Sequence, residues 1–122
     1  MNYKQITLTE QQISIILHDI LKTLDIIEES RINQRFLFRS SDILISSDFK
    51  IKLSDHLFES YRYDYNQCIN YQSAPYWSAP EDVISGRKNV VSVNIWSLGC
   101  IAIELSEGRP PYYEFNHIKA ML

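Results

Sequence analysis

The fold of this chain is decided by the stretch Ser92-Val-Asn-Ile-Trp-Ser-Leu-Gly-Cys-Ile-Ala-Ile-Glu-Leu-Ser-Glu-Gly-Arg-Pro-Pro-Tyr112. Over residues 92–107, apolar side chains fall on nearly every side of a period of about 3.6 residues, which is typical of a central buried helix. Gly108 supplies a C-terminal stop, and Pro110-Pro111 prevent the helix from continuing. We therefore expect a buried helix that ends at Glu107.

A second helix is indicated near the N-terminus. Thr9-Glu-Gln-Gln12 has the form of a capping box, in which the Thr9 hydroxyl and the Gln12 side chain each satisfy a free backbone donor. The apolar residues that follow recur at spacings of three and four and form one continuous face: Ile13, Ile16, Leu17, Ile20, Leu21, Leu24 and Ile27. We expect a helix from about Thr9 to Glu29 that contacts the helix of residues 92–107, with Trp96 and Leu98 among the more buried side chains.

The residues between these helices predict a short hairpin and a long loop. Ile43–Ile45 and Ile51–Leu53 alternate like strands on either side of a polar turn. Residues 54–78 are rich in Tyr, Asn, Gln and Ser without a sustained period, which favours a long loop. A last short helix can begin near Asn116. The fold class predicted is mainly α with a short β-hairpin.

Composition places the chain among intracellular globular proteins. Its 122 residues suit one domain, and 45% hydrophobic with 22% charged residues is ordinary for a folded protein. A net charge of -3 without long charged runs provides no basic field, so we expect neither nucleic acid nor membrane as a partner. Cys68 and Cys100 lack metal-ligand spacing and are interpreted as reduced thiols. The sequence shows neither an apolar signal segment nor an apolar stretch long enough to span a membrane, so we expect a cytoplasmic protein.

Two motifs carry a resemblance to a known family. Tyr76-Trp-Ser-Ala-Pro-Glu81, followed by Asn94-Ile-Trp-Ser-Leu-Gly99 and the residues up to Tyr112, closely resembles the end of a kinase activation segment and the F helix of Sterile-20 Ser/Thr protein kinases. Leu8-Thr-Glu10 resembles the opening of the E helix in the mammalian sterile-20-like branch. Asp42-Ile-Leu-Ile45 resembles the segment after the catalytic loop. The resemblance covers nearly the whole chain.

The resemblance implies a partial C-terminal lobe of the protein kinase fold. The expected parts are the E helix, the catalytic-loop hairpin, the activation segment, the F helix and the start of the G helix. Residues 1–122 would form one partial kinase-like domain, consisting of the C-lobe without the N-lobe and without the late C-lobe helices. Kinases bind ATP between two lobes, so we expect no nucleotide cofactor for such a domain.

The same resemblance points to altered catalytic positions. A kinase needs an Asp that accepts the proton of the substrate hydroxyl, a Lys near the transferred phosphate, and oxygen ligands for magnesium. Counted back from Asp42, the base position is Leu37, which cannot accept a proton, and Arg39 stands at the catalytic-loop Lys position. Asp42 and Asp55 occupy the two magnesium positions. The functional interpretation of these two carboxylates is a remnant magnesium pair, and the alternative is two ordinary polar residues at the ends of a hairpin.

Three further positions that assist catalysis in the family are also altered in this sequence. Ala74 replaces a Thr hydroxyl that contacts the catalytic Asp in the family, and Asn70 stands where the branch carries its activating phospho-Thr. Asn94 replaces the F-helix Asp that braces the catalytic loop. Each change removes a hydroxyl or a charge tied to catalysis.

These residues lead to a prediction that the chain is not an enzyme. We expect an inactive Ser/Thr kinase-like protein, a truncated pseudokinase, that acts by binding another protein such as a protein kinase or a scaffold protein. One alternative is a Ser/Thr protein kinase that transfers phosphate from ATP with a lobe supplied by another chain. A second is a truncated gene product without selected function. We expect Leu37→Asp to restore no activity, and nucleotide stabilisation together with phosphate transfer rescued by Leu37→Asp would favour the enzyme.

Overall fold

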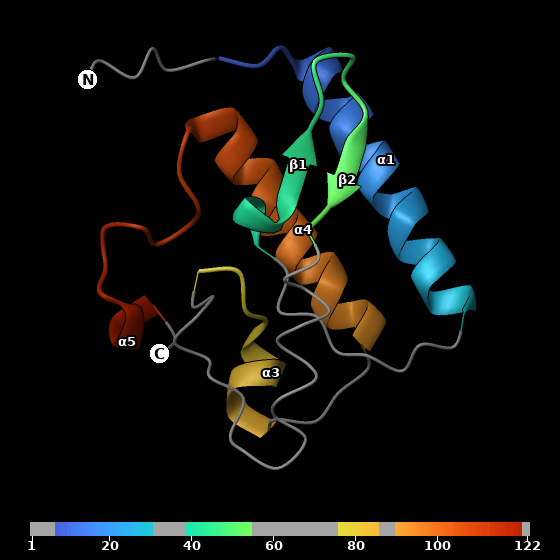
Figure 1. Ribbon diagram of the computed structural model, residues 1–122. Helices are drawn as coiled ribbons and strands as arrows, with labels where there is room; N and C mark the ends of the chain where they lie inside the picture. The colour runs from blue at the N-terminus through green and yellow to red at the C-terminus, as the bar shows by residue number, and fades with distance from the viewer. Residues whose placement is uncertain (1–6, 31–38, 55–75, 86–89, 121–122) are drawn as a thin grey trace.

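A small antiparallel hairpin lies against the two long helices of this protein (Figure 1). The computed structural model describes residues 7–30, 39–54, 76–85 and 90–120. Its elements, in chain order, are α1 (Glu10–Glu29), a 3-10 turn (Ser40–Asp42), β1 (Ile43–Ile45), β2 (Ile51–Leu53), α3 (Pro80–Ser85), α4 (Val90–Glu107) and α5 (His117–Ala120). A mostly helical chain with a two-stranded sheet confirms the predicted fold class and is consistent with a partial kinase C-lobe.

Helix α1 begins where its capping box predicts. The Gln12 backbone N–H donates to Thr9 Oγ1 at 3.2 Å, and the Thr9 N–H donates to Gln12 Oε1 at 2.9 Å. This reciprocal pair satisfies donors that the first helical turn leaves free. The helix runs to Glu29, and the Ser30 N–H donates to the Ile26 carbonyl at its end. The predicted range of Thr9 to Glu29 is therefore confirmed.

Strands β1 and β2 form the predicted hairpin. They pair antiparallel, with Ile43 opposite Leu53 and Ile45 opposite Ile51. Ser46 closes the turn, since its backbone N–H donates to the Lys50 carbonyl at 3.0 Å. Phe49 takes a φ of 59° in this turn, a left-handed conformation that is uncommon for residues other than glycine. The hairpin lies against α1 and α4 through the partly buried residues Ile43, Ile51 and Leu53.

The core is formed where α1 meets α4. Ile16 and Ile20 of α1 pack with Leu98 and Ile101 of α4, and all four side chains are buried. The predicted contact between the two helices is therefore confirmed. The partly buried residues that pack around this cluster are Leu8, Leu17, Leu24, Ile27, Ile43, Ile51, Leu53, Trp77 and Leu105.

The prediction that α4 is buried all round, with Trp96 in the interior, is wrong. Trp96 is 46% exposed, and Ile95 and Ile103 are exposed to a similar extent. One side of α4 faces α1 and the hairpin (Figure 1), whereas Ile95, Trp96 and Ile103 each keep about half of their surface exposed. A helix that is apolar all round thus buries one face fully and leaves the other face partly exposed to solvent here.

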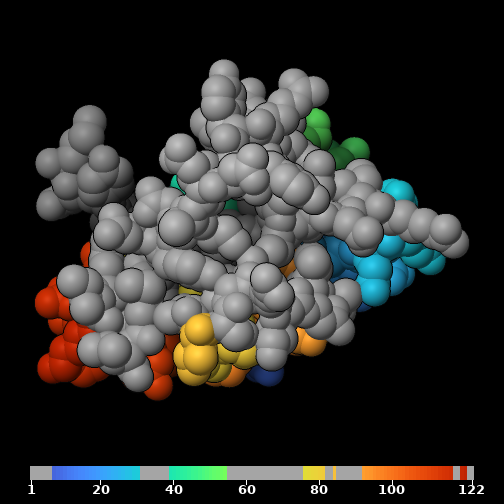
Figure 2. Space-filling model, turned by 90° about the horizontal axis from the view of Figure 1, so that it is seen from below, coloured from blue at the N-terminus to red at the C-terminus, as the bar shows by residue number. Residues whose placement is uncertain are grey.

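Two short elements were not predicted from the sequence. The 3-10 turn Ser40–Asp42 lies directly before β1, and α3 begins at Pro80. Seen from below, the surface around α3 lies beside the C-terminal segment (Figure 2), and Ile84 of α3 is 84% exposed. The predicted long loop falls largely on residues 55–75, which lie outside the described residues. Within the described ranges, no helix has the length and apolar character needed to cross a membrane.

Candidate functional site

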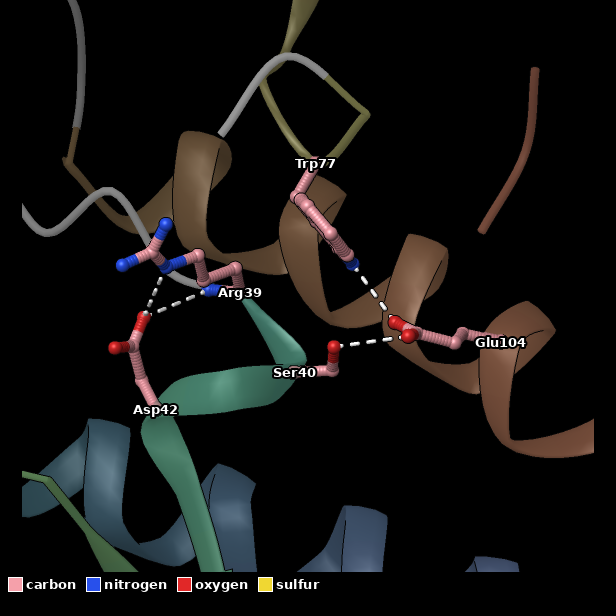
Figure 3. Close-up of polar contacts among 5 residues, drawn as sticks. All are labelled: Arg39, Ser40, Asp42, Trp77 and Glu104. Atoms are coloured by element: carbon pink, nitrogen blue, oxygen red, sulfur yellow. Dashed lines mark hydrogen bonds and ion pairs between the residues drawn. The ribbon is translucent and has the colours of Figure 1, made fainter. Parts of the chain in front are cut away.

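Glu104 of α4 joins two segments that are distant in the sequence (Figure 3). The Ser40 hydroxyl donates to Glu104 Oε1 at 2.9 Å, and the Trp77 indole Nε1–H donates to Oε2 at 3.0 Å. Ser40 belongs to the 3-10 turn before β1, and Trp77 precedes α3. Hydrogen bonds to an ionised carboxylate are stronger than those between neutral groups. Each oxygen of this one carboxylate therefore holds a different segment against α4.

Trp77 is fixed to α4 through its backbone as well. The Ser97 hydroxyl lies 2.7 Å from the Trp77 carbonyl and donates to it, and Ser97 is buried. The neighbouring Tyr76 stacks edge-on against Trp77, and its hydroxyl donates to the Phe115 carbonyl at 2.8 Å. The segment that resembles the end of a kinase activation segment is thus attached to α4 on one side and to the C-terminal segment on the other.

The turn that presents Ser40 is stabilised by Arg39 and Asp42. The Arg39 backbone N–H donates to Asp42 Oδ2 at 3.2 Å, and Arg39 Nε lies 3.6 Å from the same oxygen (Figure 3). The Asp42 backbone N–H donates to the Arg39 carbonyl, and the Ser54 N–H donates to the Asp42 carbonyl. Asp42 is 5% exposed, so its charge is buried and lies against a cation. The described positions of the catalytic-loop pattern thus form one closed turn.

Of the four sequence-predicted site residues, the structure describes Arg39 and Asp42 and brings them together. Leu37 and Asp55 lie outside the described residues. Of the two carboxylates predicted to hold magnesium, Asp42 has Oδ2 committed to Arg39, and no group of three or more candidate metal ligands occurs in the described ranges. Magnesium bound by a protein takes several oxygen ligands in a near-ideal octahedron. The described residues do not by themselves form such a site.

Asn94 lies in the first half of α4 and is buried. Its side chain is 6% exposed, and its Oδ1 is buried without a hydrogen-bond partner in the part of the chain that the structure describes. An unpaired buried acceptor costs about 1–3 kcal/mol. A position at which the family is expected to carry a bracing Asp is therefore occupied here by a buried neutral amide.

Glu104 and Ser40 were missed by the sequence analysis. Glu104 did leave a signal, because it is the one charged residue between Val90 and Ser106, inside an otherwise apolar helix. A lone charge in an apolar run usually has a partner. Ser40 left no comparable signal, since serine is common in turns and its contact with Glu104 is made across 64 residues of sequence.

The comparisons with known proteins cover the same stretch. A family model described as the protein kinase domain matches residues 1–121. The chain is 36% identical over 124 residues to the serine/threonine-protein kinase pakA of Dictyostelium discoideum, covering 98% of this chain and 10% of that protein. It is 38% identical over 117 residues to shk1/pak1 of Schizosaccharomyces pombe, covering 94% of this chain and 17% of that kinase. Against PAK 5 of Rattus norvegicus it is 36% identical over 115 residues, covering 93% and 16%.

These similarities confirm the resemblance to Sterile-20-type Ser/Thr kinases and correct one prediction. The chain was predicted not to be an enzyme because Leu37 stands at the base position. Its relatives are named as serine/threonine-protein kinases, and this contradicts that prediction. The chain spans between 10% and 17% of the length of the three relatives described above.

Proposed function

This chain belongs to the protein kinase family, and we propose that it forms the substrate-side part of a domain that transfers phosphate from ATP to Ser or Thr hydroxyls of proteins. One observation carries the proposal. The turn of the catalytic-loop pattern and the end of the activation segment meet at the carboxylate of Glu104. A kinase must hold these two segments in a fixed relation, because its catalysis is almost entirely positioning and electrostatic stabilisation.

Because Leu37 stands at the position of the general base, we expect slow phosphate transfer rather than none. Leu37 cannot take the proton of the attacking hydroxyl, and losing a positioned general base reduces a rate by about 10²–10⁴. The positive charge of Arg39 remains at the position of the catalytic-loop Lys. Positioning and charge stabilisation therefore support a slow transfer of phosphate.

The test measures phosphate incorporation by the full-length protein. With magnesium-ATP labelled on the γ-phosphate and a generic protein substrate, we expect slow labelling of Ser and Thr. Arg39→Ala should reduce the labelling by about 10²-fold, which is typical of losing one charge-stabilising group. The matched control is Arg109→Ala, an exposed arginine beyond the end of α4, which should leave labelling unchanged.

Leu37→Asp sharpens the test because it returns an acceptor to the base position. If transfer is limited by the missing base, labelling should rise by about 10²–10⁴. No labelling from the wild-type protein and none from Leu37→Asp would overturn the proposal. The expectation from the sequence that no nucleotide is bound stays a prediction and opposes this proposal, and labelling that depends on magnesium-ATP would decide against that expectation.

A second function, protein binding, is favoured by the open face of α4. Ile95, Trp96 and Ile103 are each more than 40% exposed on this helix. Exposed apolar patches often mark interfaces between proteins. The proposed partner is another protein kinase or a scaffold protein. Co-precipitation of a defined kinase or scaffold that is lost in Trp96→Ala, with phosphate transfer unaffected, would support this second function.

A further inference from the structure

The two hydrogen bonds on Glu104 share one planar group. Ser40 donates to Oε1 and Trp77 donates to Oε2, so each donor occupies a different oxygen of the same carboxylate (Figure 3). A displacement of either donor turns or shifts this carboxylate. The hydrogen bond on the other oxygen then changes its length and angle, and such bonds weaken steeply as their geometry departs from linear.

We propose that Glu104 is a positioning residue that couples the turn at Ser40 to the segment at Trp77, so that a change on one side alters the other. For its effect on catalysis the inference rests on the proposed kinase function. For the coupling itself it rests on the contacts alone. Ser40 and Trp77 are 37 positions apart in the sequence, and their common described contact is the carboxylate of Glu104.

Each side is internally fixed, which makes the carboxylate the point at which motion is transmitted. On one side, Arg39 and Asp42 close the turn through a backbone and a side-chain contact to the same oxygen. On the other side, Ser97 holds the Trp77 carbonyl against α4 at 2.7 Å. Hydrogen-bond networks between rigid elements can carry coupling between two sites, and the coupling itself is shown only by measurement.

The chemistry of the two donors allows a sharp set of variants. Glu104→Gln keeps both contacts without charge, because its carbonyl oxygen accepts from the Trp77 indole and its amide donates to the Ser40 hydroxyl. Glu104→Ala removes both contacts. Ser40→Ala and Trp77→Phe each remove one contact and leave α4 intact. Glu107→Ala, an exposed glutamate at the end of the same helix, is the matched control.

The experiment is hydrogen exchange by mass spectrometry on the full-length protein, reading peptides that cover residues 39–45 and 76–85. Glu104→Ala should speed exchange in both peptides by about tenfold, which corresponds to one factor of ten in the local opening constant. Glu104→Gln should stay close to wild type, and Glu107→Ala should match it. Ser40→Ala should speed exchange in residues 76–85, and Trp77→Phe in residues 39–45.

The inference is overturned if each substitution changes hydrogen exchange only in the peptide that contains it. If Ser40→Ala changes only residues 39–45 and Trp77→Phe changes only residues 76–85, Glu104 makes two independent bonds and couples nothing. These single variants keep the test decisive if Glu104→Ala fails to fold. Where phosphate transfer is measured, Ser40→Ala should also raise the KM for a protein substrate more than it lowers kcat. Absence of transfer would overturn the proposed function and leave the exchange result standing.

Discussion

At the scale of single residues, Cys100 shows how α4 changes the chemistry of a side chain. It is 8% exposed, and burial, with a smaller contribution from the negative charge of Glu104, raises the pKa of its thiol above the ordinary value of 9.0. The thiol is free. Burial disfavours the thiolate because a charge is poorly solvated in the interior. The prediction of a reduced thiol at Cys100 is consistent with this environment, whereas Cys68 lies outside the described residues.

A pH dependence of stability follows from this raised pKa. A group with a raised pKa in the folded state stabilises the fold below its unfolded pKa and loses that contribution as pH rises through the folded pKa. Relative to Cys100→Ala, the free energy of unfolding of the wild-type protein should therefore fall as pH rises above about 9. Urea unfolding of both proteins between pH 7 and 10 measures the difference. A difference that is constant with pH would contradict the assignment.

Individual residues also show what a sequence can reveal. The Thr9 and Gln12 capping box was predicted because both partners lie within one helical turn of each other. Trp96 was placed in the interior wrongly, because apolar character does not tell which face of a helix its neighbours cover. Ser40 could not be found, since its partner Glu104 is fixed by tertiary structure alone.

At the scale of elements, the contact between α1 and α4 forms the buried apolar cluster of the described chain. Ile20 has no exposed surface and packs in the cluster with Leu98 and Ile101. Ile20→Ala should destabilise the protein by about 2–4 kcal/mol, because it removes buried apolar surface and leaves a cavity. Ile26→Ala, on the same helix but 65% exposed, should change stability by about 0.5 kcal/mol or less.

Chemical denaturation of the two isoleucine variants provides the measurement. The comparison removes helix propensity from the result, since both substitutions replace isoleucine with alanine in α1. Equal losses of stability in the two variants would show that the buried face of α1 has been assigned to the wrong residues.

The attachment of the Trp77 segment to α4 gives a second prediction at this scale. Ser97→Ala removes the hydroxyl that donates to the Trp77 carbonyl and should destabilise the protein by about 1 kcal/mol. Ser106→Ala is the matched control, because the Ser106 hydroxyl bonds only to the Ile103 carbonyl of its own helix among the described contacts. Thermal melts of both variants, with the Tm of Ser106→Ala close to wild type, check the prediction. A larger loss in Ser106→Ala would contradict it.

At the scale of the whole molecule, the order of the helices and strands could be predicted from the sequence, whereas the side chains that surround each of them could not. The hairpin and both long helices follow from local patterns of alternation and of three-and-four spacing, which need no knowledge of distant residues. The described part of the candidate site was only half predictable. Arg39 and Asp42 came from the kinase pattern, whereas Glu104 acquires its role from contacts with two segments across 64 and 27 residues.

The central claim is that α4 joins the catalytic-loop turn to the activation-segment end through Glu104. A double-mutant cycle with Ser40→Ala and Trp77→Phe tests it most directly, since, among the described contacts, the group that the two side chains share is the carboxylate of Glu104. Residues in one hydrogen-bond network show interaction energies of about 0.5–3 kcal/mol.

The measurement is the free energy of unfolding of the full-length protein by urea, for wild type, both single variants and the double variant, repeated with Glu104→Leu in all four. We predict a coupling of at least about 0.5 kcal/mol between Ser40 and Trp77 that disappears when Glu104 is Leu. Strictly additive effects of the two substitutions in the presence of Glu104, or an equal coupling in its absence, would contradict the account.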